Sequence, residues 1–124
     1  MLNQTAQPDE IILVCDGPLT DKQNQVIEEY SSNIKVLRLE QNQGLGIALS
    51  EGLKICNNEW IARMDSDDIS AASRCELQLD YLEQHHKIDV LSGTLAEFEG
   101  NVCTEKEALR LITSYKLCRS LIMN

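Results

Sequence analysis

The sequence is poor in aromatic side chains and contains no long apolar run. Aromatic residues make up 4% of the 124 residues, against 43% for hydrophobic residues as a whole, so aliphatic side chains must form most of the core. No segment approaches the roughly 18–20 consecutive apolar residues that a membrane-spanning helix needs. The first ten residues, "MLNQTAQPDE", contain neither a basic region nor an apolar stretch, and we therefore expect no signal peptide.

The cysteines lack the pattern of a disulfide framework or a zinc site. There are five of them, an odd number, and no two form a Cys-x-x-Cys pair. Dispersed thiols without a secretory signal are typical of a reducing compartment. We therefore expect a cytoplasmic protein with reduced cysteines.

Positive charge is also scarce. The chain has 11 Lys and Arg against 20 Asp and Glu, which gives a formal net charge of −9. Binding to nucleic-acid phosphates depends on clusters of basic residues, so we expect no nucleic-acid partner. The acidic excess is uneven: residues 65–99 hold nine acids and two bases, whereas residues 100–124 hold two acids and four bases.

Apolar segments alternate along the chain with segments of helical periodicity. The first, "EIILVCDG" at residues 10–17, is typical of a strand buried on both faces of a parallel sheet. Further strands are expected at 34–39, 59–64 and 88–93, and helices from Thr20, over 45–56, from Ser70 or Ser73, and from Thr104. This alternation indicates βαβ units. It predicts one α/β domain over residues 1–124, a three-layer sandwich with a mostly parallel sheet.

Two of the expected helix starts carry a capping-box pattern. Thr20 is followed three residues later by Gln23, and Ser73 by Glu76. In such a box the hydroxyl and the longer side chain each satisfy a backbone N–H of the first turn. We therefore expect Thr20 and Ser73 to be helix N-caps.

The stretch "WIARMDSDDIS", residues 60–70, places three carboxylates directly after an expected strand. One interpretation is that these acids are helix caps or solvated turn residues, since Asp is favoured at those positions. That interpretation accounts poorly for all three, because their mutual repulsion needs a compensating cation. Carboxylates at the C-terminal end of a parallel strand also lie where open α/β sheets bind ligands. Their oxygens suit Mg²⁺ or Mn²⁺ together with the phosphates of a nucleotide.

Two other acid-rich sites can be compared by spacing. A calcium EF-hand loop needs Gly at its sixth position, which is Ser70 when counted from Asp65. A phosphatase with an aspartyl nucleophile would also fit Asp-x-Asp after a strand. Such enzymes usually carry this motif on the first strand of the sheet, and here the strand is the third expected.

In order and spacing, three segments resemble the family-2 glycosyltransferases of GT-A fold. They are "EIILVCDG", "NQGLGIALSEGLKICNNEWIARMDSDDIS" and "RCELQLDYLEQHHKIDVLSG". The resemblance extends over residues 1 to about 100 and implies a partial GT-A domain, the fold of nucleotide-diphospho-sugar transferases. Residues 101–124 do not follow the family and are expected to form a divergent helical tail.

The resemblance implies which residues bind the nucleotide-sugar donor. The family carries an acidic pair and Gly after the first of these strands, where an Asp contacts the uracil or ribose, and Asp16 occupies that position. Cys15 replaces the first acid of the pair. The family's Asn-x-Gly segment, which leads into the helix beside the donor, corresponds to Asn42-Gln43-Gly44. Without the resemblance, Gly44 would be read as part of a flexible turn.

The resemblance also implies a metal site. The family's Asp-x-Asp motif falls on Asp65 and Asp67, which would hold Mn²⁺ or Mg²⁺ on the diphosphate of a UDP-sugar-type donor, with Asp65 also counted among the donor-binding residues. The metal would stabilise the departing nucleoside diphosphate as a Lewis acid. Asp68 follows as the family's common extra acid and is expected mainly to cap a helix.

Two parts of the family pattern are absent from the sequence. Residues 1–10 resemble the end of the family's first helix, so its first strand is missing, and the later acceptor half with the catalytic base is missing too. No catalytic residue is therefore assigned, and His85 and His86 are expected to be exposed. In GT-A sheets the missing strand lies between those ending at Asp16 and Asp65. These two strands are expected to close up or to be joined by another chain, which favours a homo-oligomer.

Two functions remain open at this point. The first is a truncated glycosyltransferase domain, whose intact parent transfers a sugar from a nucleotide-diphosphate donor to an acceptor hydroxyl with inversion. Whether this chain is itself an enzyme stays undecided. The second is a non-catalytic remnant that associates with itself or with a partner.

Overall fold

The computed structural model describes residues 1–93 and 120–123, and its contacts form two compact units. The first contains Pro8–Ile69 and the C-terminal strand. The second contains Leu2–Gln7 and the segment that begins at Ser70. Each unit is described by itself.

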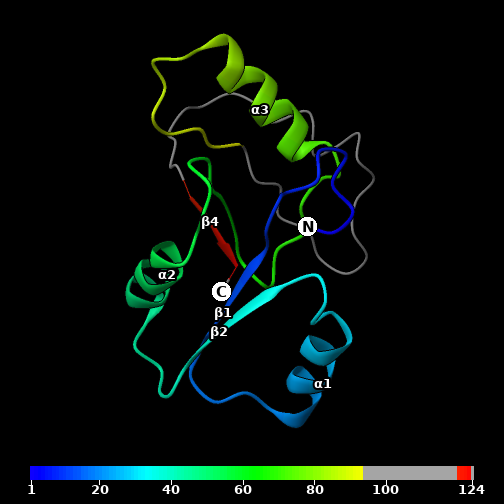
Figure 1. Ribbon diagram of the computed structural model, residues 1–124, viewed down its shortest axis with the longest axis vertical. Coiled ribbons are helices and arrows are strands. Elements are labelled where there is room, and N and C mark those ends of the chain that lie inside the picture. The colour runs from blue at the N-terminus through cyan, green and yellow to red at the C-terminus, as the bar shows by residue number, and fades with distance from the viewer. Residues whose placement is uncertain (94–119, 124) are drawn as a thin grey trace. The chain divides into compact units, whose positions relative to one another are not determined.

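The first unit is built on a four-stranded parallel sheet (Figure 1). Its strands are β1 (Ile12–Asp16), β2 (Lys35–Leu39), β3 (Ala62–Met64) and β4 (Ser120–Met123), in the order β2-β1-β4-β3. β1 and β2 are in register along their whole length, from Ile12 opposite Lys35 to Asp16 opposite Leu39. These strands and the intervening helices confirm the α/β class expected from the sequence.

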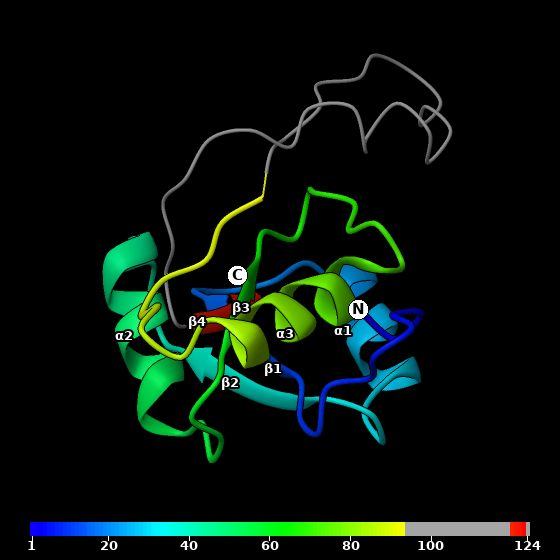
Figure 2. The ribbon, with the colours of Figure 1, turned by 90° about the horizontal axis from the view of Figure 1, so that it is seen from above.

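Two helices of this unit cover opposite faces of the sheet, as Figure 2 shows. α2 (Leu45–Lys54) places the fully buried Ala48 against Ile12 and Val14 of β1. α1 (Asp21–Glu29) lies on the other face, where Arg38 of β2 donates to Asn24 at 2.8 Å. The unit therefore has three layers, helix, sheet and helix.

The sequence pattern explains both helix positions. Leu37 and Leu39 pack against the core under α2, and Arg38 between them points to the face of α1, because neighbouring residues of a strand face opposite sides. At the start of α1, Thr20 accepts from the backbone N–H of Gln23 and the Gln23 side chain accepts from the backbone N–H of Thr20. The predicted capping box at Thr20 is confirmed.

β4 occupies the sheet position between β1 and β3 and runs parallel to both. Leu13 lies opposite Met123, and Ala62 lies opposite Ser120. The prediction of a helix from Thr104 is wrong at Ser120–Met123, which form β4. The rest of the expected helix lies outside the described residues. β1 and β3 therefore neither pair directly with each other nor need a second chain between them, because β4 lies between them. The oligomeric state stays a prediction.

Three expected elements differ from the structure. Residues 88–93 form no strand, because they pair with no strand of the described chain and Ile88 donates to the carbonyl of His85 in a turn. β3 is only three residues long, shorter than the expected 59–64. Residues 1–10 contain no helix. The side chain of Gln4 donates to the Ala71 carbonyl, and that of Gln7 donates to the Leu2 carbonyl.

Among its described residues, the second unit contains α3 (Arg74–Gln84) and the N-terminal segment bonded to the start of this helix. The Ser73 hydroxyl makes no capping bond, so the predicted box with Glu76 is wrong. The buried Gln4 takes that role: its oxygen accepts from Cys75 N–H at 3.0 Å and its amide donates to the Ala71 carbonyl at 2.8 Å. The Glu76 carboxylate instead accepts from the Thr5 hydroxyl at 2.7 Å.

Candidate functional site

The candidate residues of the first unit gather at the carboxyl ends of its strands. Asp16 is the last residue of β1, Asp65 follows β3 directly, and the loop with Asn42 and Gly44 lies between β2 and α2. Because all the strands are parallel, these three strand ends lie at the same edge of the sheet. The structure therefore places the predicted residues along one edge.

Asp16 is bonded to the loop that precedes α2. One oxygen of its carboxylate accepts from the backbone N–H of Gln43 at 2.7 Å, and the other accepts from that of Gly44 at 2.8 Å. Bonds from N–H groups to an ionised carboxylate are shorter and stronger than those between neutral groups. The contact joins the end of β1 to the start of α2, and only the spacing of the motifs indicates it before the structure is known.

Gly17 brings the same two loops into close contact. Its φ of +105° lies in the left-handed region, and a Cβ at this position would come within 2.9 Å of the backbone nitrogen of Asn42. Gly44, the N-cap of α2, has φ +88° with open space around it. Glycine is therefore required at residue 17 for both space and conformation, and at residue 44 for conformation alone.

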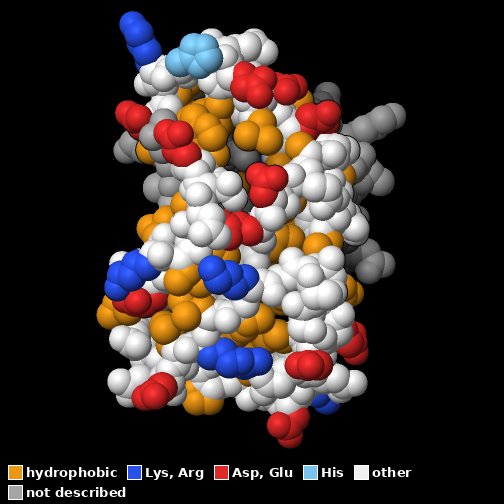
Figure 3. All heavy atoms as spheres, in the orientation of Figure 1, with side chains coloured by type: hydrophobic (Ala, Val, Ile, Leu, Met, Phe, Trp, Pro, Cys, Tyr) orange, Lys and Arg blue, Asp and Glu red, His pale blue; other side chains and the backbone are white. Residues whose placement is uncertain are grey.

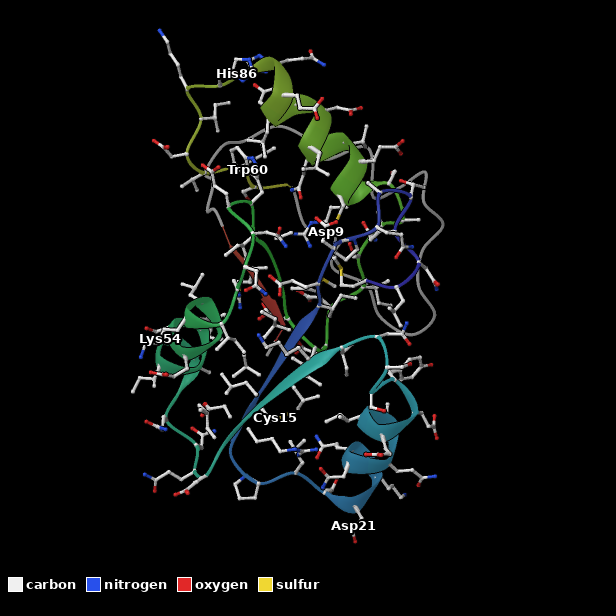
Figure 4. The ribbon with its side chains drawn as sticks, in the orientation of Figure 1. Asp9, Cys15, Asp21, Lys54, Trp60 and His86 are labelled. Carbon is white, nitrogen blue, oxygen red and sulfur yellow. The ribbon has the colours of Figure 1, made fainter. Side chains whose placement is uncertain are left out.

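Cys15 stands where the resemblance expects an acid. Cys15 is buried, with 5% exposed, and Figure 4 labels it near the end of β1. Burial raises the pKa of this thiol, and the charge of Arg38 opposes that rise only in part. Cys15 is thus a neutral core residue at neutral pH and no nucleophile.

Asp65, which directly follows β3, has a positively charged neighbour on that strand. The guanidinium of Arg63 forms an ion pair with the Asp65 carboxylate, and both side chains are about one-third exposed. The intervening Met64 is buried and fixes the end of β3. Residues two apart in an extended segment share a face, so a pair between the strand residue Arg63 and the residue just after the strand could have been anticipated from the sequence. Arg63 supplies part of the compensating charge that the acidic stretch requires.

The two following acids lie in an exposed turn. The backbone N–H of Asp68 donates to the Asp65 carbonyl at 3.2 Å, and the side chains of Asp67 and Asp68 are exposed. The expectation that Asp68 caps a helix is wrong, because α3 begins at Arg74 after the N-cap Ser73. Asp68 therefore belongs to the turn.

The residues present fit a hard divalent cation by their donor atoms. Within residues 1–93 and 120–123, no three acidic, His or Cys side chains are grouped as a complete metal site. Mg²⁺ commonly takes only one or two carboxylates and completes its shell with water and phosphate oxygens. Asp65 and Asp67 can supply such a pair, provided that Arg63 leaves an oxygen of Asp65 accessible.

His85 and His86 belong to the second unit. His85 is the C-cap of α3, where its Nδ1 contacts the Tyr81 carbonyl at 2.8 Å and its ring stacks on that of Tyr81. Both histidines are exposed, as the sequence analysis expects. His85 thus has a structural role at the end of the helix.

The surface of α2 carries exposed apolar side chains, which Figure 3 shows reaching the surface around this helix. Leu45, Ile47 and Leu53 are each between 42% and 46% exposed. The buried contact is made instead by the small residues Ala48 and Gly52. Part of the apolar stripe of α2 therefore remains open to other contacts.

Comparison with known proteins identifies the group to which these motifs belong. The family described as Glycosyl transferase family 2 matches residues 1–120. An uncharacterized glycosyltransferase of Haemophilus influenzae is 43% identical over 104 residues, covering 82% of this chain and 39% of that protein. The UDP-Gal:alpha-D-GlcNAc-diphosphoundecaprenol beta-1,3-galactosyltransferase of Escherichia coli is 41% identical, over 78% of this chain and 36% of its own length.

A glycosyltransferase of amylovoran biosynthesis from Erwinia amylovora is 38% identical over 77% of this chain and 37% of its own length. The chain thus spans well under half the length of these relatives. No solved structure gave a significant match. In the described part of the chain, the helices are all too short or too polar to cross a membrane.

Proposed function

The chain belongs to glycosyltransferase family 2, and from this premise we propose that its first unit binds the nucleoside diphosphate of a sugar donor. The reaction of the intact protein would transfer the sugar to an acceptor hydroxyl with inversion. The binding site would lie at the carboxyl ends of β1, β2 and β3, where ligands of open parallel sheets bind. The gathering of Asp16, the Asn42–Gly44 loop and Asp65 along this one edge carries the proposal.

The cation would bind to Asp65 and Asp67. Asp65 is held at the end of β3 by its pair with Arg63, whereas Asp67 is exposed in the following turn. A divalent ion, Mn²⁺ or Mg²⁺, neutralises the diphosphate as it leaves the sugar. In its absence Arg63 partly offsets the repulsion between neighbouring acids. Arg63 and the metal therefore compete for the same carboxylate.

The nucleotide would lie over the loop that leads into α2. Asn42 is exposed there, and Gly44 leaves open space around its backbone. A UDP-sugar is the donor that we favour, because the name of the Escherichia coli relative specifies UDP-Gal. The free thiols Cys15, Cys56 and Cys75 favour a cytoplasmic site of action.

A second candidate function is a module that associates with itself or with a partner. The exposed Leu45, Ile47 and Leu53 of α2 favour it, because apolar side chains left exposed on a helix can be buried in an interface. In that case a homo-oligomer would form without any ligand. Light scattering over a range of concentrations measures the oligomeric state directly.

Thermal unfolding with UDP and Mn²⁺ separates the two functions. A ligand that binds only the folded state, at about ten times its Kd, stabilises that state by about 1.4 kcal/mol, and for a chain of this size the melting temperature should rise by about 5 °C. We expect this rise with the unmodified chain, and its loss in Asp67→Ala. Asp9→Ala is a matched control, because it removes a carboxylate outside the acidic turn. A melting temperature that UDP and Mn²⁺ leave unchanged at millimolar concentration would favour the second function.

A further inference from the structure

Arg63 is the basic side chain that lies next to the first acid of the proposed metal site. Its Nη2 nitrogen forms an ion pair with the Oδ1 oxygen of Asp65 at the end of β3. We propose that Arg63 is a further binding residue for the sugar donor: its guanidinium leaves Asp65 when the cation and the donor bind, and it then contacts the diphosphate. The inference rests on the proposed function and deepens it, because it names a group of this chain that recognises the phosphates.

The charges of this segment favour a role for Arg63 beyond screening the acids. Residues 63–68 contain three acids and one arginine, an excess of two negative charges that a divalent cation balances. A diphosphate adds roughly two negative charges while it is joined to the sugar, and roughly one more when the sugar leaves. The loaded site is therefore negative again, and a guanidinium close to the phosphates stabilises it.

The first unit offers few other basic side chains for this contact. The bases among its described residues are Lys22, Lys35, Arg38, Lys54 and Arg63. Lys35 is the first residue of β2, at the end of the strand opposite to the candidate site. Arg38 donates to Asn24 of α1, and Lys54 forms an ion pair within its own helix. Of these described bases, only Arg63 pairs with an acid at the carboxyl end of a strand.

The Arg63 side chain is partly exposed and its backbone is held in place. The exposed fraction of the side chain is 39%, and the next residue, Met64, is buried. Solvent screens a partly buried charge less than a fully exposed one. A guanidinium also binds phosphate oxygens through two parallel N–H bonds, so the planar fork of Arg63 suits a diphosphate as well as it suits a carboxylate.

The change of partner follows from the charges around Asp65. Without a nucleotide, Arg63 and a divalent cation compete for this carboxylate and repel each other. A diphosphate offers Arg63 a second anionic partner, so that the guanidinium no longer opposes the cation. Arg63 therefore lowers the affinity for the cation alone and raises the affinity for the diphosphate once the cation is bound. Cation and diphosphate are then coupled through Arg63, and by linkage each tightens the binding of the other.

The experiment uses three variants of the full chain. Arg63→Met removes the charge, and Arg63→Lys keeps the charge but not the planar fork of donors. Lys54→Met is the matched control, because it also removes one positive charge and one ion pair, in this case on α2. Thermal unfolding of each variant is measured first without ligand, and binding is then measured well below every melting temperature.

NMR titrations with UDP and with uridine, both at saturating Mg²⁺, give two Kd values for each variant. Mg²⁺ is diamagnetic and leaves the signals sharp, and at saturation any difference in cation affinity between the variants has no effect. The side-chain Nε–H signal of Arg63, assigned by its absence from Arg63→Met, reports the surroundings of the guanidinium directly. Neither measurement depends on activity.

We expect Arg63→Met to bind UDP about tenfold more weakly than the unmodified chain and to bind uridine equally well. Arg63→Lys should lie between the two, because an ammonium keeps the attraction but forms no bidentate contact. Lys54→Met should match the unmodified chain. In the unmodified chain, UDP with Mg²⁺ should shift the Nε–H signal of Arg63, and uridine with Mg²⁺ should leave it in place.

Three results would overturn the inference and leave the proposed function intact. The first is UDP binding by Arg63→Met that is as tight as that of the unmodified chain, or tighter. The second is an equal loss of affinity for UDP and uridine, since a phosphate contact cannot weaken a ligand without phosphates. The third is a Nε–H signal of Arg63 that UDP does not move. If the unmodified chain binds UDP with Mg²⁺ no better than uridine, the proposed function fails and this inference fails with it.

Discussion

Replacing Arg63 should increase the affinity of the acidic turn for a divalent cation in the absence of nucleotide. Arg63 forms an ion pair with Asp65, the first acid of the proposed metal site. A metal ion and a guanidinium cannot both use the same carboxylate oxygen, and they also repel each other. Arg63→Met removes the charge but keeps an unbranched side chain that can fill the same space.

The size of the effect follows from the exposure of the two side chains. Opposite charges in contact interact by about 4 kcal/mol when the effective dielectric constant is that of a protein surface. The exposed fractions, 39% for Arg63 and 34% for Asp65, mean that solvent screens much of this interaction. A net effect of about 1 kcal/mol remains. We therefore expect Mn²⁺ to bind about fivefold more tightly to Arg63→Met.

Electron paramagnetic resonance of free Mn²⁺, titrated with protein, measures this affinity without nucleotide or activity. Arg38→Met serves as the matched control, because Arg38 lies on β2 and bonds to Asn24 of α1, not to an acid of the turn. The control should bind Mn²⁺ as the unmodified chain does. If Arg63→Met binds Mn²⁺ equally or more weakly, Arg63 does not compete with the metal and the reasoning is wrong.

Two further predictions concern stability. Gly17→Ala forces a side chain into a φ of +105° and within 2.9 Å of the Asn42 nitrogen, so the free energy of unfolding should fall by about 2–4 kcal/mol in a urea titration. Hydrogen bonds from the Asn57 backbone lower the pKa of Glu10 more than any other cause. The stability that Glu10 provides is therefore full above the ordinary carboxyl range and is lost as the pH falls through its lowered pKa. Glu10→Gln should be less stable than the unmodified chain at pH 7, by less than about 1 kcal/mol, and equal to it at the lowest pH, as thermal unfolding across pH can test. A difference that persists in acid would contradict this account.

Periodicity and short-range chemistry made the first unit predictable. Continuous apolar residues identified β1, and the spacing of Thr20 and Gln23 identified both the start of α1 and its capping bonds. The parallel order then followed from strands that alternate with helices. The edge where the candidate residues gather was therefore predictable before any coordinate was known.

Contacts between distant segments account for most errors. Ser73 has the pattern of an N-cap, yet Gln4 provides the capping bond of α3 from about 70 residues away. The last residues of the chain suit a helix by local pattern, but β4 forms there because an open position between two strands offers backbone partners. A local sequence pattern does not reveal partners that are distant in the sequence, so tertiary contacts can override the structure that the pattern predicts.

The site was predictable in its residue types but not in their bonds. Asp16 and Asp65 lie where the motifs indicate. The hydrogen bonds from the backbone N–H groups of Gln43 and Gly44 to Asp16 depend on how closely the loop before α2 approaches β1. The pair with Arg63 could have been recognised, since Arg63 lies on β3 two residues before Asp65.

The position of β4 has a consequence for how the protein reaches its folded state. Leu13 and Met123, which lie opposite each other in the sheet, are separated by 110 residues of sequence. Closing so long a loop is slow, and topologies rich in such distant pairs fold slowly. β1 and β2 can pair early, but the sheet remains divided until residues 120–123 reach the position between β1 and β3. During that interval the half-formed sheet presents two unpaired strand edges, which are open to pairing with other chains.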